Sequence, residues 1–364
     1  MDNSRIEGLC KTLKAEGMAA VLVCPSEELR VLMGVTPKMC WRFQGLFIKD
    51  DGGMFYVCNR LYTDEVDRLF DGKVKIYTWW DGESMTDRVA KAFEENGIPE
   101  GALLGAGSAA HAFNVLDIAE ACGVTFKNGR DALNEARIVK TEDEMNSLRK
   151  AAQIADLAMM AMVGHIQPGM NEKEIKEYLL ETLSMLGGKE PKGIVASGPN
   201  SSYPHYMGGI RVIEERDIIV LDFGCTVNGM YADITRTLFV GEPTEEQKKV
   251  YEIVRRANEA GEAAAVTGAW IPDIDKAARG LITDEGYGEY FTTRLGHGIG
   301  YMNHEAPDIK KNNERRLKLG MAFSIEPGIY LGGNFGVRIE DILIATPDGH
   351  EILNKLPKEM VIIK

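Results

Sequence analysis

One stretch of the chain, residues 220–237, constrains the fold more than any other. It reads Val-Leu-Asp-Phe-Gly-Cys-Thr-Val-Asn-Gly-Met-Tyr-Ala-Asp-Ile-Thr-Arg-Thr. The Asn228-Gly229 pair between two apolar runs predicts a β-hairpin with a two-residue turn. Such a turn places Thr235 opposite Asp222, and Asp233 diagonal to Asp222 on the same face. Two carboxylates would then project from one hydrophobic surface, where like charges need a cation or a shared proton.

A second hairpin, predicted over residues 321–346, repeats this arrangement. Glu326 and Glu340 lie one on each of its strands, and a loop of Gly332-Gly333-Asn334 would place them directly opposite each other. Two related halves, each with an acid pair on its strands, can bring four carboxylates to a central cleft. Two divalent cations would balance those four charges.

An imidazole is available nearby in residues 295–300, Leu-Gly-His-Gly-Ile-Gly. Oxygen-rich ligation with one imidazole suits Mn²⁺, Fe²⁺, Co²⁺ or Zn²⁺. The same string is a poor dinucleotide loop, because its glycine spacing is wrong and it does not open a helix after a strand. His205 and His304 also lie beside glycine or proline turns and are further candidates for the site. The other histidines are interpreted as structural residues: His111, His165 and His350.

Composition limits the class of protein. A chain of 364 residues suggests two domains, and 45% apolar with 27% charged residues is ordinary for a globular protein. The net charge of −13 argues against a nucleic acid or an anionic membrane as partner. The six cysteines are scattered and form no Cys-x-x-Cys pair, so neither a zinc ribbon nor a disulfide framework is indicated. The N-terminus lacks an apolar signal core, and no apolar run approaches ~20 residues, so we expect a cytoplasmic protein without a membrane segment.

Residues 1–127 alternate helical and strand patterns, which predicts an α/β domain with a mixed sheet. Trp79 and Trp80 within it are interpreted as core or sheet-edge residues. The domain boundary is expected near residues 128–130, and residues 198–203 are expected to form a polar loop. Helices of the second domain are predicted at residues 133–139, 142–162, 171–186, 242–266 and 273–283.

The order of these motifs resembles the pita-bread metallopeptidases, which include prolidase, aminopeptidase P and methionine aminopeptidase. The match runs from about Ile138 to the end, and residues 1–127 more weakly resemble the creatinase-type N-terminal domain. The resemblance implies an α/β (α+β) chain in which residues 128–364 form a pita-bread catalytic domain with two pseudo-symmetric halves. The motifs are Asp222-Phe-Gly, Ala232-Asp-Ile-Thr-Arg-Thr, Gly296-His-Gly-Ile-Gly, His304-Glu-Ala-Pro, Ile325-Glu-Pro-Gly-Ile-Tyr and Val337-Arg-Ile-Glu-Asp.

The resemblance also implies two divalent cations, Mn²⁺ in the first place and Co²⁺, Zn²⁺ or Fe²⁺ as alternatives. Asp233 and Glu340 would bridge them, Asp222 would complete one cation, and His297 with Glu326 the other. All five positions are filled. This argues against the metal-free creatinases and against a non-catalytic peptide-binding relative, which are the remote alternatives.

The implied reaction is hydrolysis of an Xaa-Pro peptide bond by a metal-activated water. Glu326 would serve as general base, and His205 or His304 would stabilise the oxyanion. Thr235 and Arg338 are expected to orient the ligands. Prolidase, which acts on dipeptides, is favoured by the compact length over aminopeptidase P, which trims longer peptides. The family implies a homodimer.

One position departs from the family pattern. The family often has Gly-Tyr-x-Ser-Asp before its second aspartate, whereas this chain has Gly-Met-Tyr-Ala-Asp over residues 229–233. The aromatic residue has moved by one position, which places it on the opposite face of the strand. The resemblance therefore assigns no role to Tyr231.

Overall fold

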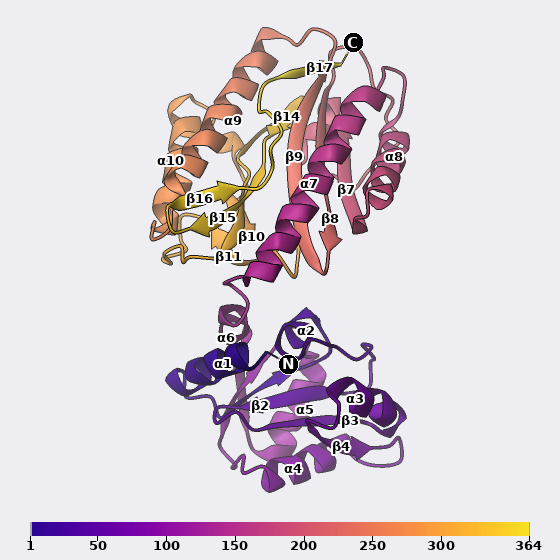
Figure 1. The fold of residues 1–364 in the computed structure, drawn as a ribbon, viewed down its shortest axis with the longest axis vertical. Helices are drawn as coiled ribbons and strands as arrows, with labels where there is room; N and C mark the ends of the chain where they lie inside the picture. Colours follow the sequence, from indigo (N-terminus) through magenta and orange to yellow (C-terminus); the bar gives the residue numbers. More distant parts are fainter. Residues whose placement is uncertain (1, 364) are drawn as a thin grey trace. The chain divides into compact units, whose positions relative to one another are not determined.

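The computed structural model describes residues 2–363 and divides into two compact units, Met1–Arg137 and Ile138–Lys364 (Figure 1). The first unit ends at residue 137, whereas the sequence analysis expects the boundary near residues 128–130. Two elements account for the difference. Strand β6 (Thr125–Asn128) extends the first sheet by pairing with β5 (Leu103–Ala106), and helix α6 (Arg130–Glu135) packs against α1 (Asn3–Ala15).

The helix predicted at residues 133–139 was wrong in its bounds, because α6 ends at Glu135. The side chain of Asn128 accepts a hydrogen bond from the Arg130 amide, at 3.0 Å, so the helix begins earlier than its apolar pattern suggests. Beyond it, Val139 forms an isolated antiparallel bridge with Met321. This bridge ties the start of the second unit to the second predicted hairpin.

The first unit is built on the mixed sheet that the sequence predicts. Its strands follow the order β4-β3-β2-β1-β5-β6, with antiparallel pairs β1–β2 and β2–β3 and parallel pairs elsewhere. Trp79 lies on the edge strand β4 and Trp80 is exposed. The remaining elements are β1 (Ala20–Val23), α2 (Glu27–Met33), β2 (Gly45–Lys49), β3 (Met54–Asn59), η1 (Arg60–Tyr62), α3 (Thr63–Phe70), β4 (Lys75–Trp79), α4 (Met85–Glu95) and α5 (Ala112–Cys122).

The first half of the second unit is a four-stranded sheet in the order β17-β9-β8-β7, covered by two helices (Figure 1). The helices are α7 (Glu142–His165) and α8 (Glu172–Met185), and each begins with a capping box. The strands are β7 (Lys189–Ser197), β8 (Ile218–Val227), β9 (Met230–Val240) and β17 (Val361–Ile363). The loop expected at residues 198–203 is instead the 3₁₀ helix η2 (Gly198–Ser202), with a proline in its first turn.

The β8–β9 hairpin has the register that its turn predicts. Asn228 and Gly229 both adopt positive φ, +50° and +80°, as the two central residues of this turn type require. Asp222 pairs with Thr235, and Gly224 pairs with Asp233. The two aspartates therefore lie on one face of the sheet, as predicted.

The second half repeats the plan with α9 (Glu245–Ala264) and α10 (Ile271–Asp284), which pack against each other and against a second group of strands. Its main sheet has the order β11-β10-β12-β15-β16, and β13 pairs with β14. The elements are η3 (Gly288–Tyr290), β10 (Gly296–Gly298), β11 (Glu305–Ile309), β12 (Ala322–Ile325), β13 (Gly328–Leu331), β14 (Phe335–Arg338), β15 (Asp341–Thr346) and β16 (Gly349–Ile352).

The second hairpin also has its predicted register. Leu331 pairs with Phe335, which leaves residues 332–334 as the loop. On the far side of the acids, Ile325 pairs with Asp341 in the same register, so Glu326 and Glu340 face each other in the gap between the two ladders. The halves meet here, because the Glu340 amide donates to the Thr235 carbonyl at 3.1 Å.

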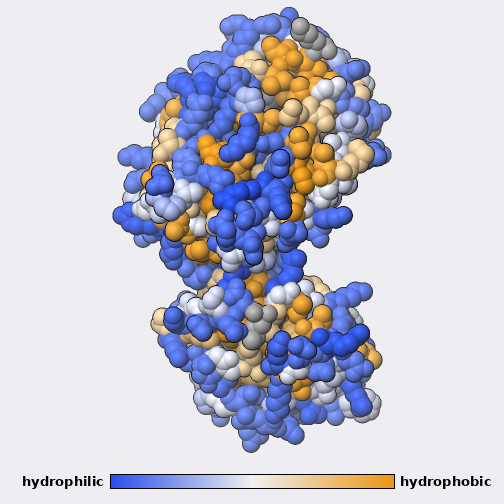
Figure 2. Space-filling model, viewed as in Figure 1, coloured by the Kyte–Doolittle hydropathy of each residue, from blue (hydrophilic) through white to orange (hydrophobic). Residues whose placement is uncertain are grey.

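The face of the molecule in Figure 2 is mostly hydrophilic, with hydrophobic atoms gathered over α7 in the second unit. The exposed apolar side chains of that helix include Leu157, Met160 and Val163. No helix within residues 2–363 is both long and apolar enough to cross a bilayer.

Candidate metal centre

A cavity of about 600 Å³ lies where the two hairpins meet. It collects residues from both halves of the second unit, which are far apart in the sequence. Thr235 is the one predicted site residue outside the cavity wall; it is fully buried behind Glu340. The predicted residues that line the cavity are His205, Asp222, Asp233, His297, His304, Glu326, Arg338 and Glu340.

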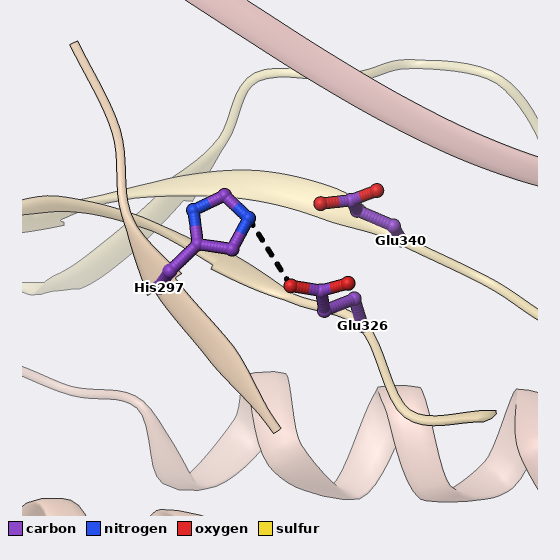
Figure 3. Close-up of side chains that lie close together, drawn as sticks. All are labelled: His297, Glu326 and Glu340. Atoms are coloured by element: carbon purple, nitrogen blue, oxygen red, sulfur yellow. Dashed lines mark ion pairs between the residues drawn. The ribbon is translucent and has the colours of Figure 1, made fainter. Parts of the chain in front are cut away.

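The five predicted ligands form two overlapping groups. One contains His297, Glu326 and Glu340, and the other contains Asp222, Asp233 and Glu340; within each group the ligand atoms lie within 4.8 Å of one another. Figure 3 shows the first group, in which the imidazole of His297 and the carboxylates of Glu326 and Glu340 point toward one another. Glu340 is shared, which is the geometry expected of a residue that bridges two cations.

The state of Glu340 tests whether the cluster fits cations. Its Oε2 accepts a hydrogen bond from Thr235 Oγ1 at 2.7 Å, whereas its buried Oε1 has no partner among the described residues. A buried carboxylate oxygen without a partner is costly. Burial and the charge of Glu326 raise the pKa of Glu340 well above its usual range, and burial and the charge of Asp222 do the same for Asp233. Such an oxygen-rich, charge-crowded set fits divalent cations.

His297 is held so that one ring nitrogen faces the acids. Its Nδ1 lies 3.0 Å from the Gly298 carbonyl, which can only accept, so Nδ1 carries the proton. Its Nε2 lies 3.1 Å from Glu326 Oε1, so a proton or a cation can be shared between these two atoms. A Cβ at Gly296 would come within 1.9 Å of the Ser324 carbonyl oxygen, and one at Gly298 within 2.1 Å of the Ala306 carbonyl oxygen. The flanking glycines are therefore required by close strand packing.

Glu326 stands at the break between β12 and β13. Its amide donates to the Leu295 carbonyl at 2.7 Å, and its Oε1 accepts from Ser324 Oγ at 3.2 Å. Burial alone would raise its pKa, but the neighbouring imidazole of His297 and the Arg338 guanidinium bring the pKa below its usual range. Glu326 is thus more easily kept ionised than Asp233 or Glu340.

The two loop histidines converge on the same place. The His304 ring centroid lies 4.2 Å from that of His297 and 6.5 Å from that of His205. Burial, followed by the charges of His297 and Arg294, lowers the pKa of His304 to about 4. A neutral imidazole at this position can donate a hydrogen bond to an oxygen in the cavity.

Arg338 contacts the predicted ligand Asp222 and the neighbouring Thr235. Its Nη2 lies 2.5 Å from Asp222 Oδ2, and its Nε donates to Thr235 Oγ1 at 3.1 Å. Its Nη1 donates to the hydroxyl of Tyr330 at 2.7 Å. Tyr330 was missed at the sequence level, although it ends the Ile-Glu-Pro-Gly-Ile-Tyr motif.

A second arginine was also missed. Arg236 is buried next to Thr235, and its Nη1 donates to the Glu340 carbonyl at 2.6 Å. Its Nη2 donates to Asp341 Oδ1 at 2.7 Å. The alternation of the strand was the only available signal, because it places Arg236 on the face away from Asp233 and Thr235.

The other three histidines lie outside the cavity wall. His111 precedes α5 and stacks on Phe113, with ring centroids 5.4 Å apart. His165 ends α7 and stacks on Tyr178 at 3.5 Å, and His350 lies on β16.

Comparison with known proteins identifies the family of the chain. The model of metallopeptidase family M24 matches residues 146–347. The chain belongs to metallopeptidase family M24. An Xaa-Pro dipeptidase of Pyrococcus furiosus is 40% identical over 238 residues, covering 65% of this chain and 68% of that protein. A probable dipeptidase PepE of Mycobacterium tuberculosis is 33% identical over 351 residues, covering 95% and 92%.

A solved structure extends the M24 likeness to the whole chain. An Xaa-Pro dipeptidase from Bacillus anthracis superposes with a TM-score of 0.87 at 33% identity, covering 99% of each chain. The pita-bread fold that the sequence motifs implied is confirmed. Membership of a metallopeptidase family and the two overlapping groups of His and acid ligands together show a site that could hold metal.

Proposed function

We propose that this M24 protein hydrolyses the Xaa-Pro bond of dipeptides and requires two divalent cations to do so. One observation carries the proposal: four acids from two hairpins and the imidazole of His297 meet in one cavity. Glu340 belongs to both ligand groups, and one of its buried oxygens has no partner among the described residues. The Xaa-Pro dipeptidases similar to this chain over most of its length support the choice of bond.

Asp222, Asp233 and Glu340 would hold one cation, and His297, Glu326 and Glu340 the other. When bound, such cations lower the pKa of water and polarise a carbonyl oxygen. The carboxylate of Glu326 would accept the proton of the attacking water and pass it to the leaving nitrogen. His304 and His205, on the same side as His297, would donate hydrogen bonds to the developing oxyanion. Thr235 and Arg338 would keep the acids in place through the contacts described above.

An Xaa-Pro bond suits such a site because its nitrogen carries no hydrogen. A peptidase that must bind that hydrogen handles the bond badly, whereas a cavity that accepts the ring by shape does not. The Pro204-His205-Tyr206 segment borders this cavity through Pro204 and His205.

The test compares hydrolysis of Ala-Pro and Ala-Pro-Ala with added Mn²⁺ and then with a chelator. We expect Ala-Pro to be cleaved and the activity to disappear on chelation. Cleavage of Ala-Pro-Ala after its first residue would instead identify an Xaa-Pro aminopeptidase. Failure to cleave either peptide with cations bound would refute the proposal.

We further propose Mn²⁺ as the cation used, since four carboxylates and one imidazole favour a hard, oxygen-seeking metal. Stripped protein reloaded with Mn²⁺, Co²⁺, Zn²⁺ or Fe²⁺ should show its highest kcat/KM with Mn²⁺. A higher value with one of the other three would refute this choice.

A homodimer in the cytoplasm completes the proposal. All six cysteines are free thiols in the structure, which suits a reducing compartment. Gel filtration at working concentration should give the mass of two chains. Elution as a single chain would refute the dimer.

A further inference from the structure

The cavity wall contains charged side chains to which the proposed reaction gives no role, and Lys192 on β7 is the clearest of them. Lys192 pairs with Gly224 of β8, and Gly224 pairs with Asp233 of β9. Residues opposite one another on neighbouring strands project from the same face of a sheet. Lys192 therefore belongs to the same row as the Asp233 carboxylate, with a glycine between them.

The ring of Tyr231 packs near the Lys192 side chain. Tyr231 lies two residues before Asp233 on β9 and so shares its face. Its ring occupies the space above Gly224, where a Cβ would lie 2.9 Å from Tyr231 Cε1. Lys192 Nζ stands 5.8 Å from the centroid of this buried ring, within the range of cation–π attraction. The one-residue shift that places the aromatic residue at position 231 thus provides a ring against which a cation can pack at the edge of the cavity.

Lys192 differs from the other cations of the cavity wall in having no acidic partner. Arg294 lies 3.1 Å from Asp308 Oδ1, and Lys310 lies 2.7 Å from Asp308 Oδ2, so one aspartate holds both. Across residues 2–363, the ion pairs of the structure include none for Lys192, which is exposed. Its charge is available to a ligand.

The positions of Arg294 and Lys192 in the cavity wall show which part of a dipeptide would meet this charge. The charge of Arg294 acts on His304 and Glu326, which places it at the imidazole end, where the scissile carbonyl is proposed to lie. Lys192 lies instead in the row of Asp233 on the sheet of the first half, with Gly224 between them. A carboxylate oxygen of Asp222 or Asp233 that no cation occupies can still accept a hydrogen bond from the α-ammonium of a substrate. The side chain of the first residue branches from the carbon that carries this ammonium, so it extends toward Lys192.

We propose that Lys192, whose ammonium packs over the Tyr231 ring, selects dipeptides whose first residue carries a carboxylate side chain, namely Asp-Pro and Glu-Pro. This inference rests on the proposed function. Two bound divalent cations would balance the four acids of the cluster, so a substrate carboxylate would meet the lysine without strong repulsion from Asp222 and Asp233. Because the lysine is exposed, the preference for Glu-Pro over Ala-Pro in kcat/KM is modest, about 5-fold, and weakens as salt is added.

The experiment measures kcat/KM of the Mn²⁺-loaded enzyme for Glu-Pro, Ala-Pro and Lys-Pro. Lys192→Met keeps the length of the side chain and removes its charge, and Lys192→Arg keeps the charge. We expect the ratio of Glu-Pro to Ala-Pro to fall about 5-fold in Lys192→Met and to persist in Lys192→Arg. Lys189→Met, on the same strand but outside the cavity wall, is the matched control and should keep the wild-type ratios.

An unchanged ratio in Lys192→Met would overturn the inference. A second result would also overturn it: kcat/KM of Lys192→Met falls equally for all three dipeptides but is unchanged for the amide Ala-Pro-NH₂. The lysine would then bind the terminal carboxylate of the dipeptide. If the loaded wild-type protein cleaves none of the dipeptides, the proposed function fails separately. In that case calorimetry gives the dissociation constants of Glu-Pro and Ala-Pro for wild type and Lys192→Met. A ratio of these constants that is unchanged in Lys192→Met would overturn the inference, as would an equal loss of affinity for every dipeptide that is absent with Ala-Pro-NH₂.

Discussion

Replacing Glu340 with glutamine separates a metal-binding role of the acid cluster from a purely structural one. The change keeps the shape of the side chain and an oxygen that can accept the Thr235 hydroxyl, while it removes one negative charge. Glu340 belongs to both ligand groups, so both cations lose a ligand. In the stripped protein the same change relieves repulsion from Asp233 and Glu326. The two effects have opposite signs, and the presence of metal decides which one is measured.

The magnitudes follow from the structure. A cation at a concentration 100 times its Kd stabilises the folded state by about 2.7 kcal/mol per site, so loss of both sites lowers the free energy of unfolding of the loaded protein by about 5 kcal/mol. In the stripped protein, Glu340 is 1% exposed and one of its oxygens has no hydrogen bond. Replacing this ionisable group should raise the free energy of unfolding of the stripped protein at pH 7 by about 1–3 kcal/mol, because the carboxyl ionises freely in the unfolded chain and resists ionisation in the folded one.

The assay is denaturant unfolding followed by circular dichroism, with chelator-stripped and Mn²⁺-saturated samples of wild type and Glu340→Gln. Elemental analysis of the same samples counts the bound metal. Glu351→Gln is the control, because Glu351 lies on β16, outside the cavity wall, where it pairs with Arg149 of α7. Its effect should be the same with and without metal. If Glu340→Gln destabilises the stripped protein as much as the loaded one, the residue is structural and the bridging assignment fails.

Three further substitutions give sharp outcomes. Asp233→Asn removes a carboxylate that the sequence motifs imply to be a bridge and that the structure groups with Asp222 and Glu340, so it should abolish metal-dependent hydrolysis of Ala-Pro; near-native kcat would refute its role as a ligand. His297→Gln should leave about one metal per chain by elemental analysis, since one ligand group stays intact, and loss of both metals would argue against two separate groups. Burial and the charge of Asp341 raise the pKa of Glu262 to about 7 from 4.5, so the folded state binds more protons between these values and stability falls as the pH rises through them. Glu262→Gln should remove this loss, on the order of 1–3 kcal/mol between about pH 5 and pH 7.5, and a wild-type-to-variant difference independent of pH would contradict the assignment.

The parts of the site that local chemistry determines were predictable from the sequence. The Asn228-Gly229 turn allows one hairpin register, and that register alone places Asp222 and Asp233 on one face. The same reasoning placed Glu326 opposite Glu340 once a three-residue loop was assumed. In both hairpins the information lies within a few residues of the acids.

The contacts that depend on distant segments were not predictable in this way. His205 and His304 come from loops without periodicity, and only the folded chain shows that their rings lie 6.5 Å apart. The row that joins Lys192 to Asp233 requires the pairing of β7 with β8, which follow each other through a long connection with no turn signal. The short strand β6 escaped notice because its sequence, Thr-Phe-Lys-Asn, has no apolar alternation.

The contact between the two hairpins explains how a pair of weakly related halves can form one centre. Each half alone presents two acids, and neither contains both ligand groups, since Glu340 completes the group that begins with Asp222 and Asp233. The backbone bond from Glu340 to Thr235 and the side-chain bond back to the same threonine hold the shared acid against the first hairpin. Arg236, from the opposite face of β9, binds the Glu340 carbonyl and tightens the same contact. A disturbance of this junction therefore acts on both cations at once, whereas a change at His297 acts on one.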